Sequence, residues 1–402
     1  MSFQQGLSGL NAAARNLDVI GNNVANSTTT GFKQGVTSFA DVFAASLSGG
    51  GGTQVGIGTQ VTGIAQQFSQ GNLSVTSNPL DVAINGRGFF RMSNNGAIDY
   101  TRNGQFQLDK DGYIVGVGGQ NLTGFQAVNG VVVPGVLVNL QLSSADVLPK
   151  ATVNAAVGAN LASTDPILPT AGFLATNPAT YNFSTASTAY DSLGQSHTMN
   201  FYFNKTAANT WDTSVYIDGA AANGAGVSTL TFNSGGTFVS ATNLVKTAVL
   251  TNGAAPLSVT IDFSRMTQFG SAFGVNFLSQ DGYANGQLSG YSIGSDGIII
   301  GRYSNGQTQQ LGQVALSNFT NPQGLKPLGD SMWGESSDSG IPLTGAPNTA
   351  SLGILQSLAL EESNVDLTGE LVNMITAQRV YQANAQTIKT QDALMQTLVN
   401  LK

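Results

Sequence analysis

Apolar and small side chains recur near the N-terminus at alternating steps of four and three residues, which places them on one stripe of an α-helix. This is the seam spacing of a helix that wraps around a partner helix. The Asn, Ser and Thr residues that follow offer the backbone competing hydrogen bonds, so we expect the helix to end between residues 22 and 26. The stripe holds Phe3, Leu7, Leu10, Ala14, Leu17, Gly21 and Val24.

A second stripe of the same kind runs from residue 367 to residue 395, with polar Gln378 and Asp392 where it would otherwise continue. Ser363 and Asp366 have the spacing of a capping box, which predicts the start of this helix. The paired carboxylates of residues 361 and 362 are expected at the helix start, where the helix dipole stabilises them.

A lone helix of this kind gains most of its stability from packing, so the two ends need each other or copies from other chains. Spacing alone leaves both arrangements open, because a pair can bury one seam and still present Val372, Ile375 and Leu394 outward. The predicted assembly interface comprises Phe3, Leu7, Leu10, Leu17, Val24, Leu367, Leu371, Met374, Tyr381, Ala385, Ile388 and Met395.

Short alternating runs separated by Asn-Gly and Asp-Gly pairs fill the region between the ends and predict antiparallel strands. Four such pairs lie between residues 85 and 112, and the same style returns after residue 280. In the block between them, Met199, Phe201 and Phe203 share one face of a strand. The predicted fold class is mixed: terminal α-helices form a coiled-coil-like layer, and nested all-β domains, each a meander, sandwich or barrel, lie between them.

Four regions follow from these patterns. Residues 1–45 with 360–402 would form a terminal helical assembly domain, and the glycine-rich segment 46–76 a connector. Residues 77–148 with 282–359 would form an inner β-domain, into which an outer β-domain, 149–281, is inserted. This nesting predicts that both termini lie at the same end of the molecule.

Composition excludes several function classes. Charged residues make up only 9% of the 402 residues, the net charge is −7, and Lys and Arg are nowhere clustered. Nucleic acid and anionic membranes both require a basic footprint, so neither is a predicted partner. The longest apolar run is too short to insert into a membrane. The start of the chain lacks the positive charge and apolar run of a cleaved signal peptide, so export would use another route.

Candidate chemistry is sparse. With no cysteine and a single histidine, His197, thiolate metal sites and Ser-His-Asp triads are nearly excluded. We interpret His197 as a structural histidine on the face of Met199. The segment 109–112 has the opening of a calcium loop but lacks its closing ligands, and is interpreted as a turn. The pair Gly86 and Gly88 does not open a helix, so it is no phosphate cradle. No catalytic residue, cofactor or metal site is predicted.

The segment 17–33 closely resembles the N-terminal signature of the bacterial flagellar rod and hook axial proteins, and 362–389 is similar to their C-terminal signature. Residues 78–90 and 100–108 are similar to the family's inner β-domain. Residues 190–203 and 229–238 look like the outer domain of its hook members, which shorter rod members lack. The signature residues of the first segment are Asn22, Asn23, Asn26, Gly31, Phe32 and Lys33.

This resemblance implies a structural subunit of the flagellar hook, which polymerises into a curved hollow tube and serves as a flexible joint transmitting torque from rod to filament. It implies further copies of the chain, rod and hook–filament junction proteins, a hook cap and the flagellar export apparatus as partners. It also implies an extracellular location in the flagellum.

Three alternatives are weighed against it. A distal rod subunit of the same family is disfavoured by the size of the middle block. A secreted β-rich adhesin gives no reason for the paired terminal seams. A β-fold enzyme such as a glycosidase would need convergent carboxylates, whereas the sequence offers only scattered Asp residues.

Overall fold

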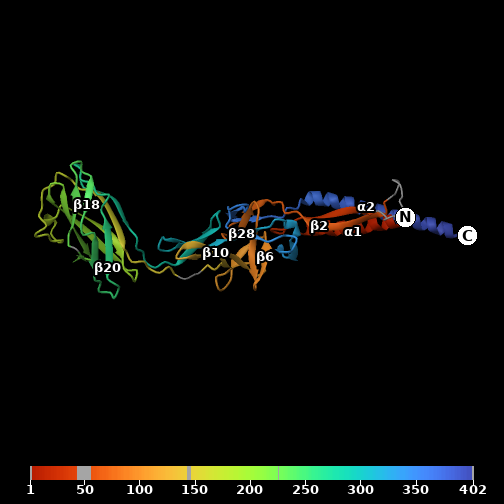
Figure 1. Cartoon of the computed structure of the whole chain (residues 1–402), viewed down its shortest axis with the longest axis horizontal. Coiled ribbons are helices and arrows are strands. Elements are labelled where there is room, and N and C mark those ends of the chain that lie inside the picture. The colour runs from red at the N-terminus through yellow and green to blue at the C-terminus, as the bar shows by residue number, and fades with distance from the viewer. Residues whose placement is uncertain (1, 43–55, 143–145, 225, 401–402) are drawn as a thin grey trace. The chain divides into compact units, whose positions relative to one another are not determined.

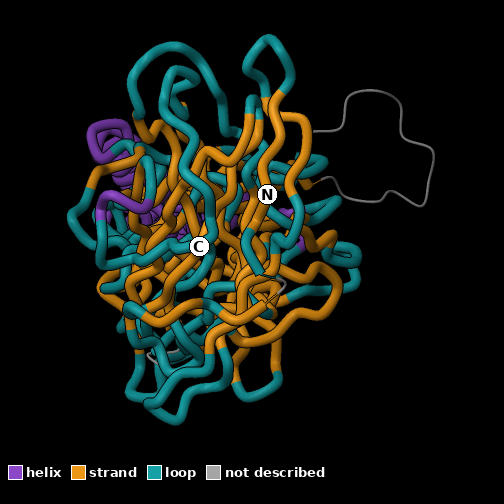
Figure 2. The backbone as a smooth tube through the Cα atoms, turned by 90° about the vertical axis from the view of Figure 1, so that its left-hand side faces the viewer, coloured by secondary structure: helices purple, strands orange, loops and turns teal. Residues whose placement is uncertain are grey.

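The computed structural model describes residues 2–42, 56–142, 146–224 and 226–400. It divides into two compact units, which are treated separately below. Unit 1 comprises residues 1–143, 290–301 and 308–402, and unit 2 comprises residues 144–289 and 302–307. Figure 2 shows that strands and loops make up most of the backbone. The predicted mixed fold class is confirmed, because the two terminal helices pack together and the described region between them is β-structure.

The helical part of unit 1 consists of α1 (Ser2–Ala25) and α2 (Leu367–Asn400), which run antiparallel with both chain ends at the same side (Figure 1). α1 ends within the predicted range. The antiparallel hairpin of β1 (Gly35–Val42) and β2 (Gly58–Gln66) lies along α1. Between α1 and β1 the chain turns at Gly31, whose φ of +71° suits glycine. A Cβ there would lie 2.6 Å from the backbone nitrogen of Asn103, so only glycine allows this close approach.

Two short strand pairs connect the helical part to the β-part of unit 1. The first joins β3 (Leu73–Val75) to β30 (Ala359–Glu361), and the second joins β4 (Val82–Asn85) to β29 (Ile354–Ser357). Both pair a segment from the first quarter of the chain with one from its last part. The outgoing and returning chains are therefore hydrogen-bonded to each other next to the helices.

The β-part of unit 1 is built on a 13-stranded sheet with the central order β22-β23-β24-β9-β5-β6-β27-β26. The turn between β5 and β6 has positive φ at both Asn95 and Gly96, as the Asn-Gly pair predicts. Two apolar clusters fill this part, one around Phe90 and Phe106 and one around Phe89 and Trp333. The central strands are β22 (Leu288–Ile293), β23 (Ile298–Tyr303), β24 (Thr308–Val314), β9 (Asn121–Val128), β5 (Phe89–Asn94), β6 (Ala97–Thr101), β27 (Met332–Gly334) and β26 (Lys326–Gly329).

The remaining strands of this sheet are β7 (Phe106–Leu108), β8 (Ile114–Gly116), β10 (Val131–Asn139), β25 (Leu316–Asn318) and β28 (Leu343–Gly345). A short 3₁₀-helix, η2 (Pro322–Gly324), precedes β26. Asp109 Oδ1 accepts hydrogen bonds from the backbone N–H groups of Asp111 and Tyr113. This segment is therefore a turn, as expected from the sequence, and its carboxylate is occupied by the backbone.

Unit 2 contains two sheets that enclose a single apolar core. The five-stranded sheet has the order β16-β19-β20-β11-β21, and the six-stranded sheet has the order β12-β13-β14-β17-β18, with β15 beside β14. Met199, Phe201 and Phe203 point into this core and are fully buried, as their alternation predicts. A 3₁₀-helix, η1 (Pro178–Thr180), precedes β12.

The strands of unit 2 are β11 (Asn154–Asn160), β12 (Phe183–Tyr190), β13 (Ser196–Ala207), β14 (Thr210–Ile217), β15 (Ala220–Ala221), β16 (Asn223–Gly224), β17 (Ser228–Phe232), β18 (Phe238–Ala241), β19 (Val245–Ala248), β20 (Leu257–Asp262) and β21 (Gly274–Gln280).

Two local predictions differ from the structure. The segment 46–76 was predicted as a connector, but β2 and β3 lie within it, because β2 pairs with β1 in a hairpin that contacts α1. Residues 43–55 lie outside the described residues. The predicted capping box is also wrong. Asp366 itself caps α2, since its Oδ1 accepts the N–H of Thr368 at 3.0 Å, while Ser363 lies outside the helix.

Candidate assembly interface

Small residues on α1 form its contact with α2. A Cβ on Gly6 would lie 3.2 Å from Cγ1 of Ile388, and a Cβ on Gly9 would lie 2.8 Å from the side-chain nitrogen of Asn384. Ala13, one turn further, is buried. Side chains of this size let two helix backbones approach closely. The pair is therefore held by close packing of small groups rather than by interlocking leucines.

The buried stripe of α1 lies one residue before the predicted one. Gly6, Ala13, Ile20 and Asn23 are buried, and each directly precedes a residue of the predicted stripe: Leu7, Ala14, Gly21 and Val24. Of the predicted residues, Phe3 and Leu7 are exposed, and Leu10, Leu17 and Val24 are half-buried. Within one chain, the larger apolar side chains of α1 are thus only partly covered.

On α2 the structure brings some predicted residues to α1 and leaves others exposed. Met374, Ala385 and Ile388 are half-buried. The exposed predicted residues are Leu367, Leu371, Tyr381 and Met395, and Val372, Ile375 and Leu394 are exposed as well. Both helices therefore carry rows of apolar side chains without cover in a single chain.

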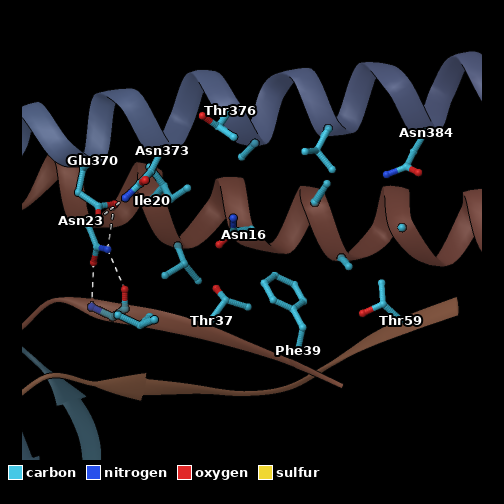
Figure 3. A pocket seen from close by; sticks show the side chains of 18 of the residues that line it. Asn16, Ile20, Asn23, Thr37, Phe39, Thr59, Glu370, Asn373, Thr376 and Asn384 are labelled. Atoms are coloured by element: carbon cyan, nitrogen blue, oxygen red, sulfur yellow. Dashed lines mark hydrogen bonds between the residues drawn. The ribbon is translucent and has the colours of Figure 1, made fainter. Parts of the chain in front are cut away.

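Asn23 joins α1 to both β1 and α2. Its side chain donates to the carbonyl oxygen of Gly35 at 2.8 Å, accepts the N–H of Gly35 at 2.9 Å, and donates to Oε2 of Glu370 at 3.3 Å. The Oε1 atom of Glu370 accepts from the side chain of Gln34 at 2.7 Å. Figure 3 shows Asn23 between the two helices and the strand below them. One buried amide, 1% exposed, thus fixes three elements relative to one another.

A buried ionic cluster lies where the helical part meets the β-part of unit 1. Glu361, at the end of β30, accepts from Lys33 Nζ at 2.6 Å and from Arg102 at 3.2 Å. Lys33 also donates to the carbonyl oxygen of Ser69, and Gly71 N–H donates to Glu361. The three charged side chains come from the loop after α1, the end of β6, and the return segment before α2. Burial without partners would make each charge very costly, so each depends on the others.

The pKa values in this cluster reflect its burial. Burial lowers the pKa of the Lys33 amine, and the neighbouring Glu361 carboxylate opposes that shift only in part. Burial likewise lowers the pKa of the Arg102 guanidinium, with Glu361 again acting in the opposite direction. For both cations, the cost of desolvation exceeds the attraction to the Glu361 carboxylate. Without that carboxylate, each cation would be buried with no opposite charge to offset this cost.

The signature residues divide into two groups. Asn23, Gly31 and Lys33 bind the returning chain, with Gly31 N–H donating to the Glu361 carbonyl oxygen at 2.8 Å. Asn22, Asn26 and Phe32 do not take part in this cluster; Asn26 instead donates to the side chain and carbonyl of Asn22 at 3.0 Å, as Thr29 donates to Asn26. The expectation that Glu361 stands at a helix start is wrong, because β30 carries it into the interior.

His197, the only histidine, lies in unit 2 between two carboxylates. Its Nδ1 is 2.5 Å from Asp218 and its Nε2 is 3.2 Å from Asp191. Asp191 also accepts from Asn252 and from the backbone N–H groups of Leu193 and Gln195. The bonds fix the start of β13 to two loops, which is the structural role expected for this histidine.

Among the described residues, no group of three or more His, Cys, Asp or Glu side chains is placed to hold a metal ion. None of the described helices is long and apolar enough to cross a membrane. The groups that converge in unit 1 instead hold distant parts of the chain together.

The chain matches the family model Flagellar basal body protein FlaE D2 domain over residues 160–283 and the model Flagellar hook protein FlgE/F/G D1 domain over residues 83–155. Its ends match Flagella basal body rod protein over residues 3–33 and Flagellar basal body rod FlgEFG protein C-terminal over residues 356–401.

The chain is 44% identical over 416 residues to Flagellar hook protein FlgE of Escherichia coli (strain K12), with 100% of both chains covered. It is 34% identical over 417 residues to the protein of that name from Rhizobium meliloti (strain 1021), covering 100% of this chain and 98% of the relative. A solved structure, the flagellar hook protein FlgE2 of Helicobacter pylori, shares its fold with a TM-score of 0.54 at 14% identity, covering 72% of this chain and 99% of the other.

Paired terminal helices that enclose nested β-domains, together with matches to flagellar models at both ends and in both β-domains, define a structural axial component of the bacterial flagellum. The 44% identity to a flagellar hook protein over the full length of both chains narrows this class to the hook protein. The chain belongs to the flagellar hook protein FlgE family. It is a structural subunit and not an enzyme.

Proposed function

We propose that this chain polymerises into a curved hollow tube that forms the flagellar hook and acts as a flexible joint between rod and filament. One observation carries the proposal: both helices expose apolar side chains, such as Leu7, Leu371 and Ile375, although the helices are already paired. Rows of exposed aliphatic groups favour burial against a partner. In a protein of the hook family, further copies of the same chain are the natural partner.

The mechanism assigns different tasks to the two kinds of surface. The terminal helices would form the cohesive inner layer, where apolar burial supplies most of the association free energy. The β-surfaces would make smaller contacts between uncharged polar groups. Ion pairs would be few in these contacts, since only 9% of residues are charged. Polar contacts with few fixed ion pairs have several arrangements of similar free energy, so they can slide as the tube turns. Bending would then cost little while torque is still transmitted.

The finer assignments belong to the same proposal. The assembly interface would comprise the twelve predicted helix residues from Phe3 to Met395. The predicted helical, inner β and outer β regions would form the helical layer, the inner β-layer and the outer β-layer. Rod and hook–filament junction proteins would bind the ends of the tube, a cap would cover the growing end, and the flagellar export apparatus would deliver the chain. The protein would lie outside the cell and leave it without cleavage of a signal peptide.

Two aspartate variants test the proposal. Leu10→Asp and Leu371→Asp each place a charge on an apolar stripe, so each should give a folded, β-rich monomer that no longer polymerises. Gln386→Asp adds the same charge at an exposed polar position of α2 and serves as the control. Polymers would be counted by electron microscopy after concentration in salt. Normal tubes from both stripe variants, or discrete particles from the unmodified chain under all conditions, would overturn the proposal.

A further inference from the structure

α2 extends beyond α1. Gly6 faces Ile388, Gly9 faces Asn384 and Asn23 lies beside Glu370, so the first described residue of α1 lies near residue 392. The helical residues after that point, 393–400, have no described residue of α1 beside them, a length of about 12 Å. Figure 1 shows this segment continuing past the N-terminus. We call residues 393–400 the overhang.

The overhang carries apolar side chains that the described part of the chain leaves largely exposed. Leu394 is 54% exposed and Met395 is 62% exposed. The last turns of a helix fray in water where no neighbour packs against them. A surface on another molecule that accepts a short helix without charged side chains would therefore stabilise this segment.

A matching groove lies in the same unit. It has a volume of about 680 Å³ and lies between α1, α2 and the β1–β2 hairpin (Figure 3). Its lining on α1 includes the small residues Gly9, Ala12 and Ala13 beside larger ones such as Asn16 and Ile20. Its walls carry apolar groups, Val36 and Phe39 from β1 and Ala377 and Val380 from α2. Small residues between apolar walls form the kind of groove into which a helix packs.

The groove is also chemically suited to the overhang. Its single charged side chain, Glu370, is already hydrogen-bonded to Asn23 and Gln34. The Oγ1 atom of Thr37, a lining residue, is buried without a hydrogen-bond partner among the described residues. The overhang carries uncharged polar groups, including Gln396, beside its apolar residues. No pair of like charges opposes docking, and Thr37 would gain a partner.

We infer that the groove of one chain receives the overhang of a second copy. The inference rests on the proposed function and names the contact that adds one copy to the next. The groove is continuous with the α1–α2 contact of its own chain, because Gly9, Ala13 and Asn384 belong to both. A docked overhang extends that helix pair into a three-helix layer. A chain cannot fill its own groove, since its overhang points away from α1.

Cross-linking between two single-cysteine variants tests this contact, because the natural chain has no cysteine. One variant carries Met395→Cys in the overhang, and the other carries Thr376→Cys on the exposed rim of the groove. The mixed variants are polymerised and treated with a short bis-maleimide linker. Each chain has one thiol, so a product joining the two variants forms only between copies. The matched control replaces Thr376→Cys by Ile64→Cys, which is 57% exposed on β2 and does not line the groove.

The expected result is a cross-linked dimer with Thr376→Cys and little or none with Ile64→Cys. Polymers that form normally but give no Thr376 product, or equal amounts of both products, overturn the inference and leave the hook function standing. If the unmodified chain never polymerises, the proposed function fails and this contact fails with it.

Polymerisation without a linker provides a second test. Thr376→Trp fills the groove from its rim and should raise the critical concentration by about ten- to hundredfold, the equivalent of losing one buried apolar side chain. Leu394→Asp should do the same from the other side of the contact. Thr368→Trp adds the same ring to an exposed position of α2 outside the groove and should change little. Equal effects of both Trp variants would contradict the inference.

Discussion

The Nζ atom of Lys33 lies 2.6 Å from Oε1 of Glu361, although 328 positions separate the two residues along the chain, and neither side chain is accessible to solvent. Arg102 of the β-part reaches the same carboxylate. The ionic cluster thus binds the helical part and the β-part of unit 1 to each other. A joint that transmits torque requires such a connection, because a loose junction would absorb rotation.

Glu361→Gln should destabilise unit 1 by about 3–5 kcal/mol, because it leaves two buried cations without a countercharge. Denaturant unfolding followed by fluorescence of Trp333, which lies in unit 1, measures this loss in a background where Trp211 of unit 2 is Phe. Lys150→Gln breaks the more exposed pair with Asp281 in unit 2 and should cost unit 2 less than about 1 kcal/mol, measured by Trp211 fluorescence in a Trp333→Phe background. Equal effects of the two variants would show that burial of the Glu361 cluster is unimportant.

Gly9→Ala and Gly21→Ala should differ, although both add one methyl group to α1. At Gly21 nothing lies within 4 Å of the new Cβ, so the gain in helix propensity should stabilise the chain by about 0.5–1 kcal/mol. At Gly9 the Cβ meets the Asn384 side chain at 2.8 Å, so the amide must move and the gain should be lost. Thermal unfolding measures both, and equal stabilisation would mean that the helices are not close at Gly9.

Asn23→Ala should destabilise the helical part by about 2 kcal/mol, because the backbone groups of Gly35 lose two hydrogen bonds inside the protein. Hydrogen exchange should show lower protection in β1 and β2. Asn22→Ala, an exposed neighbour on α1, is the control and should leave that protection unchanged. If hydrogen exchange in β1 and β2 were unchanged in the Asn23 variant, Asn23 would not be needed to fix the hairpin.

The stability of unit 2 should depend on pH through His197. Burial alone would lower the His197 pKa, but hydrogen bonds to Asp218 and Asp191 raise it. The stability that these hydrogen bonds contribute is fully present below 6.5, the His197 pKa in the unfolded chain, and is lost as pH rises through the raised pKa of the folded state. Burial would raise the Asp191 pKa, but hydrogen bonds from Asn252, His197 and the backbone lower it to about 2. The stability that ionised Asp191 contributes is therefore fully present above 3.8, its pKa in the unfolded chain, and is lost as pH falls through the lowered pKa. Stability should be greatest between roughly pH 4 and 6.5.

His197→Gln provides the control for this pH profile. It should remove the decline above pH 6.5 and lower stability at pH 5.5 by about 1 kcal/mol, a modest amount because Asp218 is half exposed. Unfolding of unit 2 is followed by Trp211 fluorescence in a Trp333→Phe background. An unchanged decline in the variant would assign the pH dependence to other groups.

Local patterns predicted the elements well. The three-and-four spacing gave both terminal helices, and the Asn-Gly pairs gave hairpins such as the one at Asn95 and Gly96. Alternation in the middle block placed Met199 and Phe201 in the core of unit 2. These features depend on neighbours within a few residues, which is the information that a single sequence carries most directly.

Contacts between distant residues were not predicted. The helix seam was placed one residue too late, because apolar size was used as the guide while Gly6 and Gly9 make the closest contacts. Glu361 was expected at a helix start, since nothing near it in sequence indicates Lys33 and Arg102 as partners. An acidic residue shortly before a helix cap, together with a lone lysine after the first helix, is the sequence signal that could have suggested the cluster.

Because Glu361 comes late in the sequence, the stability of unit 1 depends on whether the chain extends that far. A chain that stops before residue 361 contains Lys33 and Arg102 but lacks the carboxylate that makes their interior placement tolerable. Truncated products therefore cannot lock their first helix to the β-part, however well the rest has folded. Only a chain that extends at least to Glu361 can complete this connection between the first helix and the β-part.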